Sequence, residues 1–320
     1  MTEKVEGYLR KPTVQDLTGF TIEGYKILLR YLNQIYKIAP FCRISQKNTP
    51  YLILRHDVDY SLEAALEMAR LENSLGISAT YFVLASCEVY DLFEEKNAYC
   101  LKQISGLGHE IGLHFEPRKY RSYNRGVHET FRIEVQRLES LSGQKVRSIA
   151  RHNPWDRDPF ASIRGYINAN HPFWRSDLFV HDSCRAWATI ENLFTIINNP
   201  LGRVQLLVHP DNWQRDEVDR ETLIERLFAG LKRKNLSQKQ RMKRIWLHDP
   251  LVLSYEASIK NEMLMSGYEK ESGFYSKTEG SYRKKLKYYR KLVEWHLINS
   301  EAGWFIHQGL DQIRNRIGSP

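Results

Sequence analysis

An apolar run that ends in charged residues, at positions 51–59 with the sequence YLILRHDVD, most constrains how this chain can fold. Its first four residues predict a short buried strand. Buried strands of parallel sheets read as continuous apolar runs, and the chemistry of such folds lies beyond the carboxyl ends of the strands. Asp57 and Asp59 lie at such an end, so one carboxylate could hold a metal while the other takes a proton. The alternative is a strand that ends in a solvated turn, with an Asp capping the next helix.

Apolar strands and amphipathic helices alternate along most of the chain. Further strands are expected at 78–84, 109–116, 146–150 and 204–208. Helices are expected at 20–38, from Ser61 to about Gly76, and at 94–105, 127–141, 158–168 and 216–234, with Thr21 and Ser61 as N-caps. This order predicts an α/β fold with a parallel sheet and right-handed crossovers.

Polar side chains follow most of the predicted strands at the point where each strand ends. They are Asp57 and Asp59, His114 and Glu116, His152 and Asn153, and His209 and Asp211, and the loop near residue 180 adds His181 and Asp182. Because the carboxyl ends of parallel strands meet on the same side of a sheet, these residues are expected to converge. A single histidine after a strand is more often a hydrogen-bonded structural residue, but several in the same relative position favour a shared site.

The residue types in this set favour metal-assisted hydrolysis. Imidazole and carboxylate without thiolate suit zinc, cobalt, nickel, manganese or iron, and zinc is our first expectation. A divalent ion with open positions can polarise a carbonyl group and activate water. A further carboxylate could then act as base, and a further histidine could protonate the leaving group.

Composition and charge limit the class of protein further. The formal net charge of +9 favours anionic partners. No apolar run approaches the roughly 20 residues that span a bilayer. The first residues, MTEKVEGYLRKP, lack the apolar core of a secretory signal, so we expect a cytoplasmic protein with a phosphate-bearing substrate. The cysteines form no C-x-x-C pair, which indicates free thiols: Cys42, Cys87, Cys100 and Cys184.

The strand pattern stops near residue 235, so we expect a barrel domain over 1–235 and a helical, basic extension over 236–320 that packs on it. Basic residues gather at 231–244 and 282–291, which is typical of a solvated helix face. The alternative is a surface that binds nucleic acid or a membrane, in which Tyr288, Tyr289 and Trp295 would stack on bases or sit at the interface. A packed helical face explains these aromatic residues more simply, so nucleic acid is not expected and peripheral membrane contact stays open, as does the oligomeric state.

The motifs RHDVD, GHEIGLHFE, RHNPW, DSCRAW and LLVHP, in this order over residues 20–215, resemble the polysaccharide deacetylase (NodB-homology) family. The similarity is greater to its bacterial branch with an HDVD first motif, which is associated with surface-polysaccharide synthesis. The resemblance implies a distorted, incomplete (β/α) barrel. It also implies a divalent metal and the removal of N- or O-acyl groups, usually acetyl, from sugars.

The resemblance also implies roles for individual residues. Asp57 matches the catalytic base, His209 the general acid, and Asp59 and His114 the metal ligands. The family's second metal-binding histidine is replaced by Arg118, so we expect His152 to take its place, with Glu116 as the second candidate. Substrate-binding or orienting roles are expected for Glu116, Arg151, Asn153, Asp182, Trp187 and Leu207, with Arg151 orienting Asp57 and Leu207 lining the acyl site.

The expected function is therefore hydrolysis of an acyl amide on an amino sugar, carried by a nucleotide- or lipid-linked precursor of a surface polysaccharide. Two alternatives keep the barrel without the metal chemistry, because one usual ligand is replaced. They are metal-free hydrolysis of another C–N bond and binding of a glycan without catalysis.

Overall fold

The computed structural model describes residues 10–44, 50–116, 127–152, 163, 165–171, 178–187, 190–200 and 202–229. The strands are β1 (Lys37–Ala39), β2 (Tyr51–Val58), β3 (Thr80–Leu84), β4 (Glu110–Phe115), β5 (Ser148–Arg151), β6 (Ile167–Asn168), β7 (Leu178–His181) and β8 (Arg203–Val208). The α-helices are α1 (Val14–Thr18), α2 (Ile22–Ile35), α3 (Leu62–Ser74), α4 (Glu95–Gly106), α6 (Val127–Ser142), α7 (Ile190–Asn198) and α8 (Arg220–Leu227).

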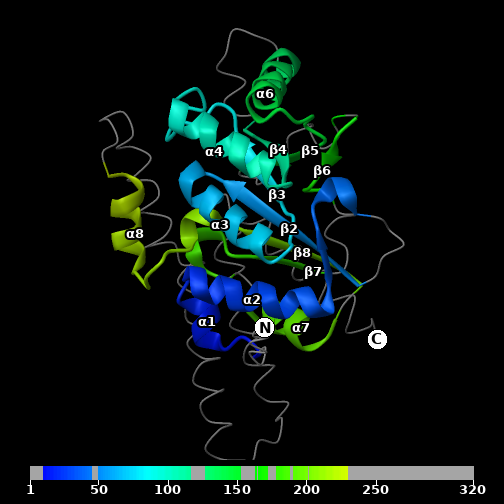
Figure 1. The fold of residues 1–320 in the computed structure, drawn as a ribbon, viewed down its shortest axis with the longest axis vertical. Helices are drawn as coiled ribbons and strands as arrows, with labels where there is room; N and C mark the ends of the chain where they lie inside the picture. The colour runs from blue at the N-terminus through cyan, green and yellow to red at the C-terminus, as the bar shows by residue number, and fades with distance from the viewer. Residues whose placement is uncertain are drawn as a thin grey trace, which may run out of the picture. The chain divides into compact units, whose positions relative to one another are not determined.

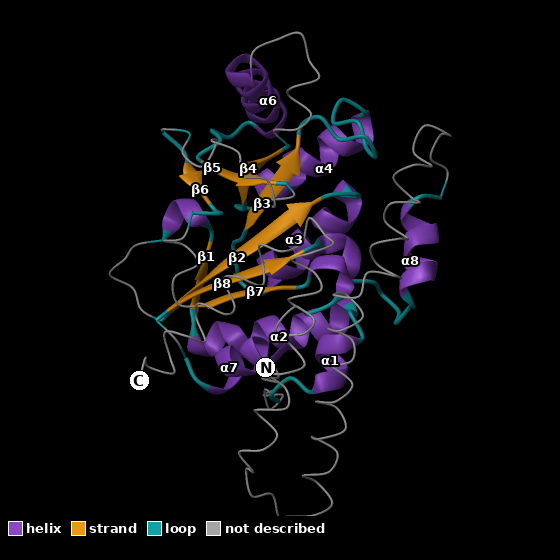
Figure 2. Ribbon diagram, turned by 180° about the vertical axis from the view of Figure 1, so that it is seen from behind, coloured by secondary structure: helices purple, strands orange, loops and turns teal. Residues whose placement is uncertain are grey.

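These strands form one parallel sheet, in the order β6-β5-β4-β3-β2-β8-β7 (Figures 1 and 2). The short strand β1 pairs with the first half of β2, and β3 pairs with its second half. Helices α3 and α4 lie on one face of the sheet in both views. The predicted distorted, incomplete (β/α) barrel is therefore confirmed.

The chain divides into two compact units, and every described residue belongs to the first, Met1–His152 with Pro159–Leu264. The second unit comprises Asn153–Asp158 and Met265–Pro320 and lies outside the described residues, as does the whole extension expected over 236–320. Among the described helices, none combines the length and the apolar character that a membrane span requires.

Successive side chains of β2 point to opposite faces of the sheet, and this alternation separates two environments. Leu52, Leu54 and Val58 pack in the larger core with the apolar residues of α2, α3 and α4. Tyr51 and Ile53 pack in a second core with Phe41, Phe82, Ala150 and Ala169. All eight residues of β2 are buried, including its charged residues, so the strand carries charge in a fully enclosed position.

Side-chain caps fix where two of the site's supporting helices begin. The hydroxyl group of Thr21 accepts a hydrogen bond from Gly24 N at 3.1 Å, and that of Ser61 accepts one from Ala64 N at 3.1 Å. Both predicted N-caps are confirmed, and each satisfies one of the free N–H groups of a first helical turn.

Some elements differ from the sequence-based expectation. Helix α2 ends at Ile35, and the next residues pair with β2 as the strand β1 instead of continuing the helix to position 38. Ile167–Asn168 forms strand β6, because its backbone pairs with β5, although a helix was expected there. The amphipathic helix α7 had not been predicted.

Candidate active site

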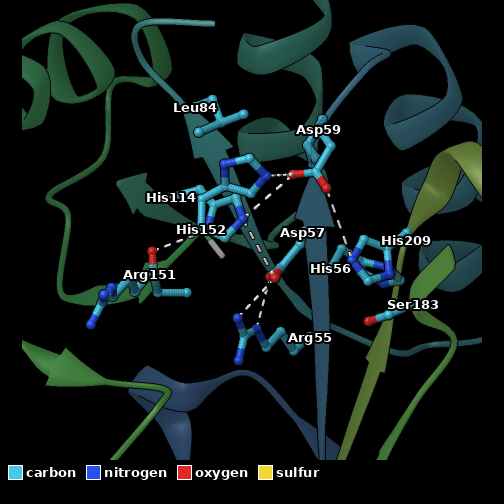
Figure 3. Close-up of polar contacts among 12 residues, drawn as sticks. Arg55, His56, Asp57, Asp59, Leu84, His114, Arg151, His152, Ser183 and His209 are labelled. Atoms are coloured by element: carbon cyan, nitrogen blue, oxygen red, sulfur yellow. Dashed lines mark hydrogen bonds and ion pairs between the residues drawn. The ribbon is translucent and has the colours of Figure 1, made fainter. Parts of the chain in front are cut away.

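Residues from four strand ends meet at one edge of the sheet (Figure 3). Asp57 lies near the end of β2 and Asp59 just beyond it, while His114 lies on β4. His152 follows β5 directly, and His209 follows β8 directly. The structure therefore brings together the five residues on which the expected site depends.

Asp59, His114 and His152 present one ligand atom each, and these atoms lie within 4.8 Å of one another. His114 Nε2 lies 3.4 Å from Asp59 Oδ1, and His152 Nε2 lies 3.9 Å from the same oxygen. His114 is 1% exposed, whereas the side chains of Asp59 and His152 are 15% and 25% exposed. The cluster is thus anchored in the interior and opens toward solvent on the side of His152.

The hydrogen bonds behind the two imidazoles determine what their Nε2 atoms can do. His114 Nδ1 lies 3.0 Å from the carbonyl oxygen of Ala150, and His152 Nδ1 lies 3.2 Å from Glu116 Oε2. Both partners are acceptors, so Nδ1 carries the proton in each ring and Nε2 of the neutral ring has a free lone pair. Partners of this kind fix the ring orientation of metal-binding histidines.

Asp59 Oδ1 and the Nε2 atoms of His114 and His152 are therefore three electron-pair donors that converge on one point. Donors this close repel each other unless a proton or a cation lies between them. Asp59 Oδ1 is buried and makes no hydrogen bond. Burial raises the pKa of Asp59, but His152 and His114 outweigh this effect when their rings are protonated and hold the pKa well below its usual value. Two imidazoles and one carboxylate are a donor set that divalent transition metals bind, and the remaining positions would be open. These residues fit such an ion.

Asp57 is held by a guanidinium from its own strand. Arg55 Nε lies 2.8 Å from Asp57 Oδ1, and Arg55 Nη2 lies 2.8 Å from Asp57 Oδ2. Burial raises the pKa of Asp57, yet the nearby charges of Arg55 and His114 bring it below the usual value. Arg55 is itself fixed by Gln205 Oε1 at 3.2 Å and lies over the ring of Phe82. The carboxylate is therefore ionised, oriented and 3.5 Å from His114 Nε2.

His209 is held by a buried carboxylate on the other side of the cluster. Its Nδ1 lies 2.7 Å from Asp182 Oδ1, which also accepts a hydrogen bond from the His209 backbone N at 2.9 Å. Trp213 Nε1 donates to Asp182 Oδ2 at 2.8 Å. Burial lowers the pKa of His209, but the hydrogen bond and charge of Asp182 outweigh it and raise the pKa to about 9. His209 Nε2 points toward Asp59 Oδ2, at 4.0 Å.

Several of the expected substrate-binding residues lie elsewhere or do something else. Trp187 is 1% exposed, its Nε1 donates to the carbonyl of Leu17 at 2.7 Å, and its ring stacks on Phe20, so it is a core residue. Asp182 is fully buried and holds His209, so it cannot reach a substrate. The guanidinium that orients Asp57 is that of Arg55 and not, as expected, that of Arg151.

The other residues expected to bind substrate are Glu116, Leu207 and Asn153. Glu116 stands behind His152 and not at the point where the three donor atoms converge. Leu207 pairs in register with Arg55 and therefore lies on the face of the sheet that carries the site. Leu84 pairs with His114 in the same way, and Figure 3 shows it beside the cluster, although the sequence had not singled it out. Asn153 lies outside the described residues.

No protein-family model and no curated protein matches the sequence. Solved structures of similar fold include peptidoglycan deacetylase PdaC from Bacillus subtilis, with a TM-score of 0.38, 14% identity and coverage of 63% of this chain and 96% of that one. A Bordetella bronchiseptica protein described as a polysaccharide deacetylase involved in O-antigen biosynthesis has a TM-score of 0.33 and 15% identity, covering 68% and 91%. A CE4 family pseudoenzyme from Bacillus anthracis has a TM-score of 0.34 and 16% identity, covering 56% and 61%.

The chain is similar to polysaccharide deacetylases. This chain spans 61–63% of the length of the pseudoenzyme structures.

The arrangement itself supports hydrolysis of an acyl group. A cation-binding cluster stands between an ionised carboxylate, Asp57, and an imidazole that is protonated at neutral pH, His209. A carboxylate that its surroundings keep ionised, beside an imidazole that its surroundings keep protonated, is the pattern that marks a catalytic base and a catalytic acid.

Proposed function

We propose that this chain is a metal-dependent hydrolase that removes an N-acyl group, acetyl in the first instance, from an amino sugar. The observation that carries the proposal is the convergence of Asp59 Oδ1, His114 Nε2 and His152 Nε2 within 4.8 Å, with Asp57 and His209 on either side. These groups supply in one place an ion site, a base and an acid, which amide hydrolysis needs together.

Asp59, His114 and His152 would hold the ion, and zinc is our first expectation. When bound, a divalent ion there polarises the acyl carbonyl group and lowers the pKa of water. His114 and His152 can bind an ion through Nε2 only while that nitrogen is unprotonated, which in the neutral ring places the proton on Nδ1. The carbonyl of Ala150 and the carboxylate of Glu116 therefore maintain the tautomer that binds.

Asp57 would take the proton from the attacking water, because Arg55 keeps it ionised and aims its carboxylate. His209 would deliver a proton from Nε2 to the departing amine, since Asp182 keeps the ring protonated and fixes it through Nδ1. Leu207 and Leu84, on the site face of the sheet, would contact the acyl methyl group.

The substrate would be a phosphate-bearing precursor of a surface polysaccharide, linked to a nucleotide or a lipid and met in the cytoplasm. The net charge of +9 supports an anionic substrate. We further propose that residues 236–320 form a separate helical and basic extension of the barrel, through which the chain could contact a membrane surface.

Metal analysis of the purified protein, followed by an assay for acetate release from N-acetylated amino sugars and their nucleotide-linked forms, tests the proposal. We expect a bound transition metal and activity that chelation removes and metal restores. Asp57→Asn and His209→Ala should each abolish turnover, whereas the exposed controls Asp216→Asn and His128→Ala should not. Binding of the sugar without acetate release, under every metal tried, would favour a glycan-binding barrel instead.

A further inference from the structure

A buried polar network lies on the opposite face of β2 from the proposed site. Its centre is Glu72 of α3, which is fully enclosed. Tyr25 donates to Glu72 Oε1 at 2.6 Å and Tyr81 donates to Oε2 at 2.9 Å. His56 Nε2 lies 2.7 Å from Oε1, and His109 Nδ1 lies 3.5 Å from Oε2. Four side chains from α2, β2, β3 and the residue before β4 thus converge on one carboxylate.

The partners of each imidazole indicate its proton count. His56 Nδ1 lies 3.2 Å from the carbonyl oxygen of Val208, which can only accept, so Nδ1 carries a proton. Its Nε2 faces the Glu72 carboxylate, with Oε1 at 2.7 Å. His109 differs, because its Nδ1 accepts from Ala79 N at 3.1 Å, so its proton lies on Nε2, which is 3.0 Å from the carbonyl oxygen of Ala69. His56 therefore joins the Glu72 carboxylate to the Val208 carbonyl.

The contact between His56 and Glu72 reaches the active site through the backbone of β8. The pairing of β2 with β8 ends at His56 and Val208, so the Val208 carbonyl is the last of that ladder. His56 Nδ1 donates a hydrogen bond to this carbonyl, and the residue that follows Val208 in the chain is His209. The peptide group between Val208 and His209 is therefore held at both of its polar atoms. His56 contacts its carbonyl oxygen, and Asp182 accepts a hydrogen bond from its N–H.

We propose that His56 is a positioning residue that places His209 through the Val208 carbonyl, with Glu72 and its tyrosines holding His56 in turn. The inference rests on the proposed function, in which His209 delivers the proton. His56 does not itself touch the substrate, because it is fully buried on the helix side of the sheet.

The competing explanation is that His56 contributes only to the stability of the core. Two variants separate these roles, because each keeps one of the two hydrogen-bonding positions of the imidazole. In His56→Asn the amide nitrogen replaces Nδ1 and can still donate to Val208, while the contact with Glu72 is lost. In His56→Gln the amide nitrogen replaces Nε2 and can still reach Glu72, while the contact with Val208 is lost. Tyr81→Phe is the control, since it weakens the network without touching either bond of His56.

The test measures kcat and KM for deacetylation with each variant as the full chain, corrected for the folded fraction. We expect His56→Gln to lower kcat by roughly tenfold to a hundredfold, the size of effect that small displacements of a catalytic group produce. KM should be unchanged, and His56→Asn and Tyr81→Phe should keep kcat within about twofold of the starting protein, a change too small to indicate displacement of the group. Equal kcat in His56→Asn and His56→Gln would overturn the proposal, as the role would then be one of stability alone.

A second readout does not depend on the reaction. In histidine-labelled protein, the ring resonances of His209, assigned by their loss in His209→Ala, should move in His56→Gln and stay in place in His56→Asn. If the starting protein proves inactive while this pattern holds, the proposed function fails but His56 still positions His209. If the His209 resonances stay in place in His56→Gln, the positioning role is wrong whatever the activity.

Discussion

Arg55 binds both carboxylate oxygens of Asp57, with one nitrogen 2.8 Å from each oxygen. The two residues lie two positions apart on β2, so their side chains emerge on the same face of the sheet. Both side chains are almost fully buried, at 2% and 6% exposed. A strand therefore supplies the proposed base together with the cation that keeps this base charged inside the protein.

Removing the guanidinium should be costly for this reason. Arg55→Met leaves Asp57 as a buried charge without its partner, and we expect the free energy of unfolding to fall by about 3–5 kcal/mol, the usual cost of breaking a buried pair. Chemical denaturation measures this loss. The exposed pair of Arg215 and Glu67 is the control, since Arg215→Met should change stability by no more than about 1 kcal/mol. The double variant Arg55→Met with Asp57→Asn should recover part of the loss, and a strictly additive result would contradict the coupling.

Glu116 is expected to act on the metal through His152. Glu116→Gln removes the charged acceptor at 3.2 Å from His152 Nδ1. Loss of such an outer partner typically lowers metal affinity by about 10–100-fold, and we expect a decrease of this size. Competition with a chromophoric chelator measures the affinity, with the exposed Glu95→Gln as control. Unchanged affinity would show that Glu116 does not support His152, whereas complete loss would indicate that Glu116 is itself a ligand.

The pKa of His209, raised to about 9, makes the stability of the metal-free protein depend on pH. The unfolded chain has a histidine pKa of about 6.5, so the folded state binds this proton more tightly. The resulting stabilisation is complete below pH 6.5 and is lost as the pH rises toward 9. NMR titration of the labelled ring should show protonation persisting well above neutrality.

The acidic partner provides the control for this titration. Asp182→Asn removes the charge at 2.7 Å from His209 Nδ1, so the pKa of His209 should fall and turnover at neutral pH should decrease with it. An unchanged pKa in this variant would mean that Asp182 is not what keeps His209 protonated.

Trp187 should affect stability and not substrate binding. Its ring packs against Phe20 and Trp213 in the core, and its N–H group is satisfied by Leu17. Trp187→Ala should lower the free energy of unfolding by about 3–5 kcal/mol, as is usual for a large core residue. The KM of the folded fraction should stay unchanged, and an increase in KM alone would restore the substrate-binding role expected from the sequence.

The sequence was sufficient for the sheet because its strands are long apolar runs with helices between them. It failed for β1 and β6, which have three and two residues. Elements this short contain no period that could distinguish a strand from the end of a helix, and only pairing with β2 and β5 defines them. The N-caps Thr21 and Ser61 were predictable because capping is local chemistry.

The sequence predicted which residues form the site better than it predicted the contacts between them. Convergence of His114, His152 and His209 follows from parallel topology, which the sequence indicates. Arg55 was missed as the partner of Asp57, because the period of two puts both side chains on one face of the strand but does not determine which guanidinium reaches the carboxylate. Likewise, the sequence could not decide whether His152 or Glu116 is the third candidate metal ligand. In the structure His152 reaches Asp59 and His114, and Glu116 contacts the far side of the His152 ring.

The alternation along β2 makes the strand unusually intolerant of changes in length. Arg55 and Asp57 belong to one face and His56 to the other, so an insertion or deletion of one residue upstream, between Tyr51 and Leu54, would exchange these faces throughout the strand's second half. Charged groups would then enter the apolar layer beneath the helices, while the imidazole that meets Glu72 would turn into the catalytic cavity. Variation in this protein should therefore accumulate as substitutions around the strand, and laboratory libraries that alter its length should yield insoluble chains.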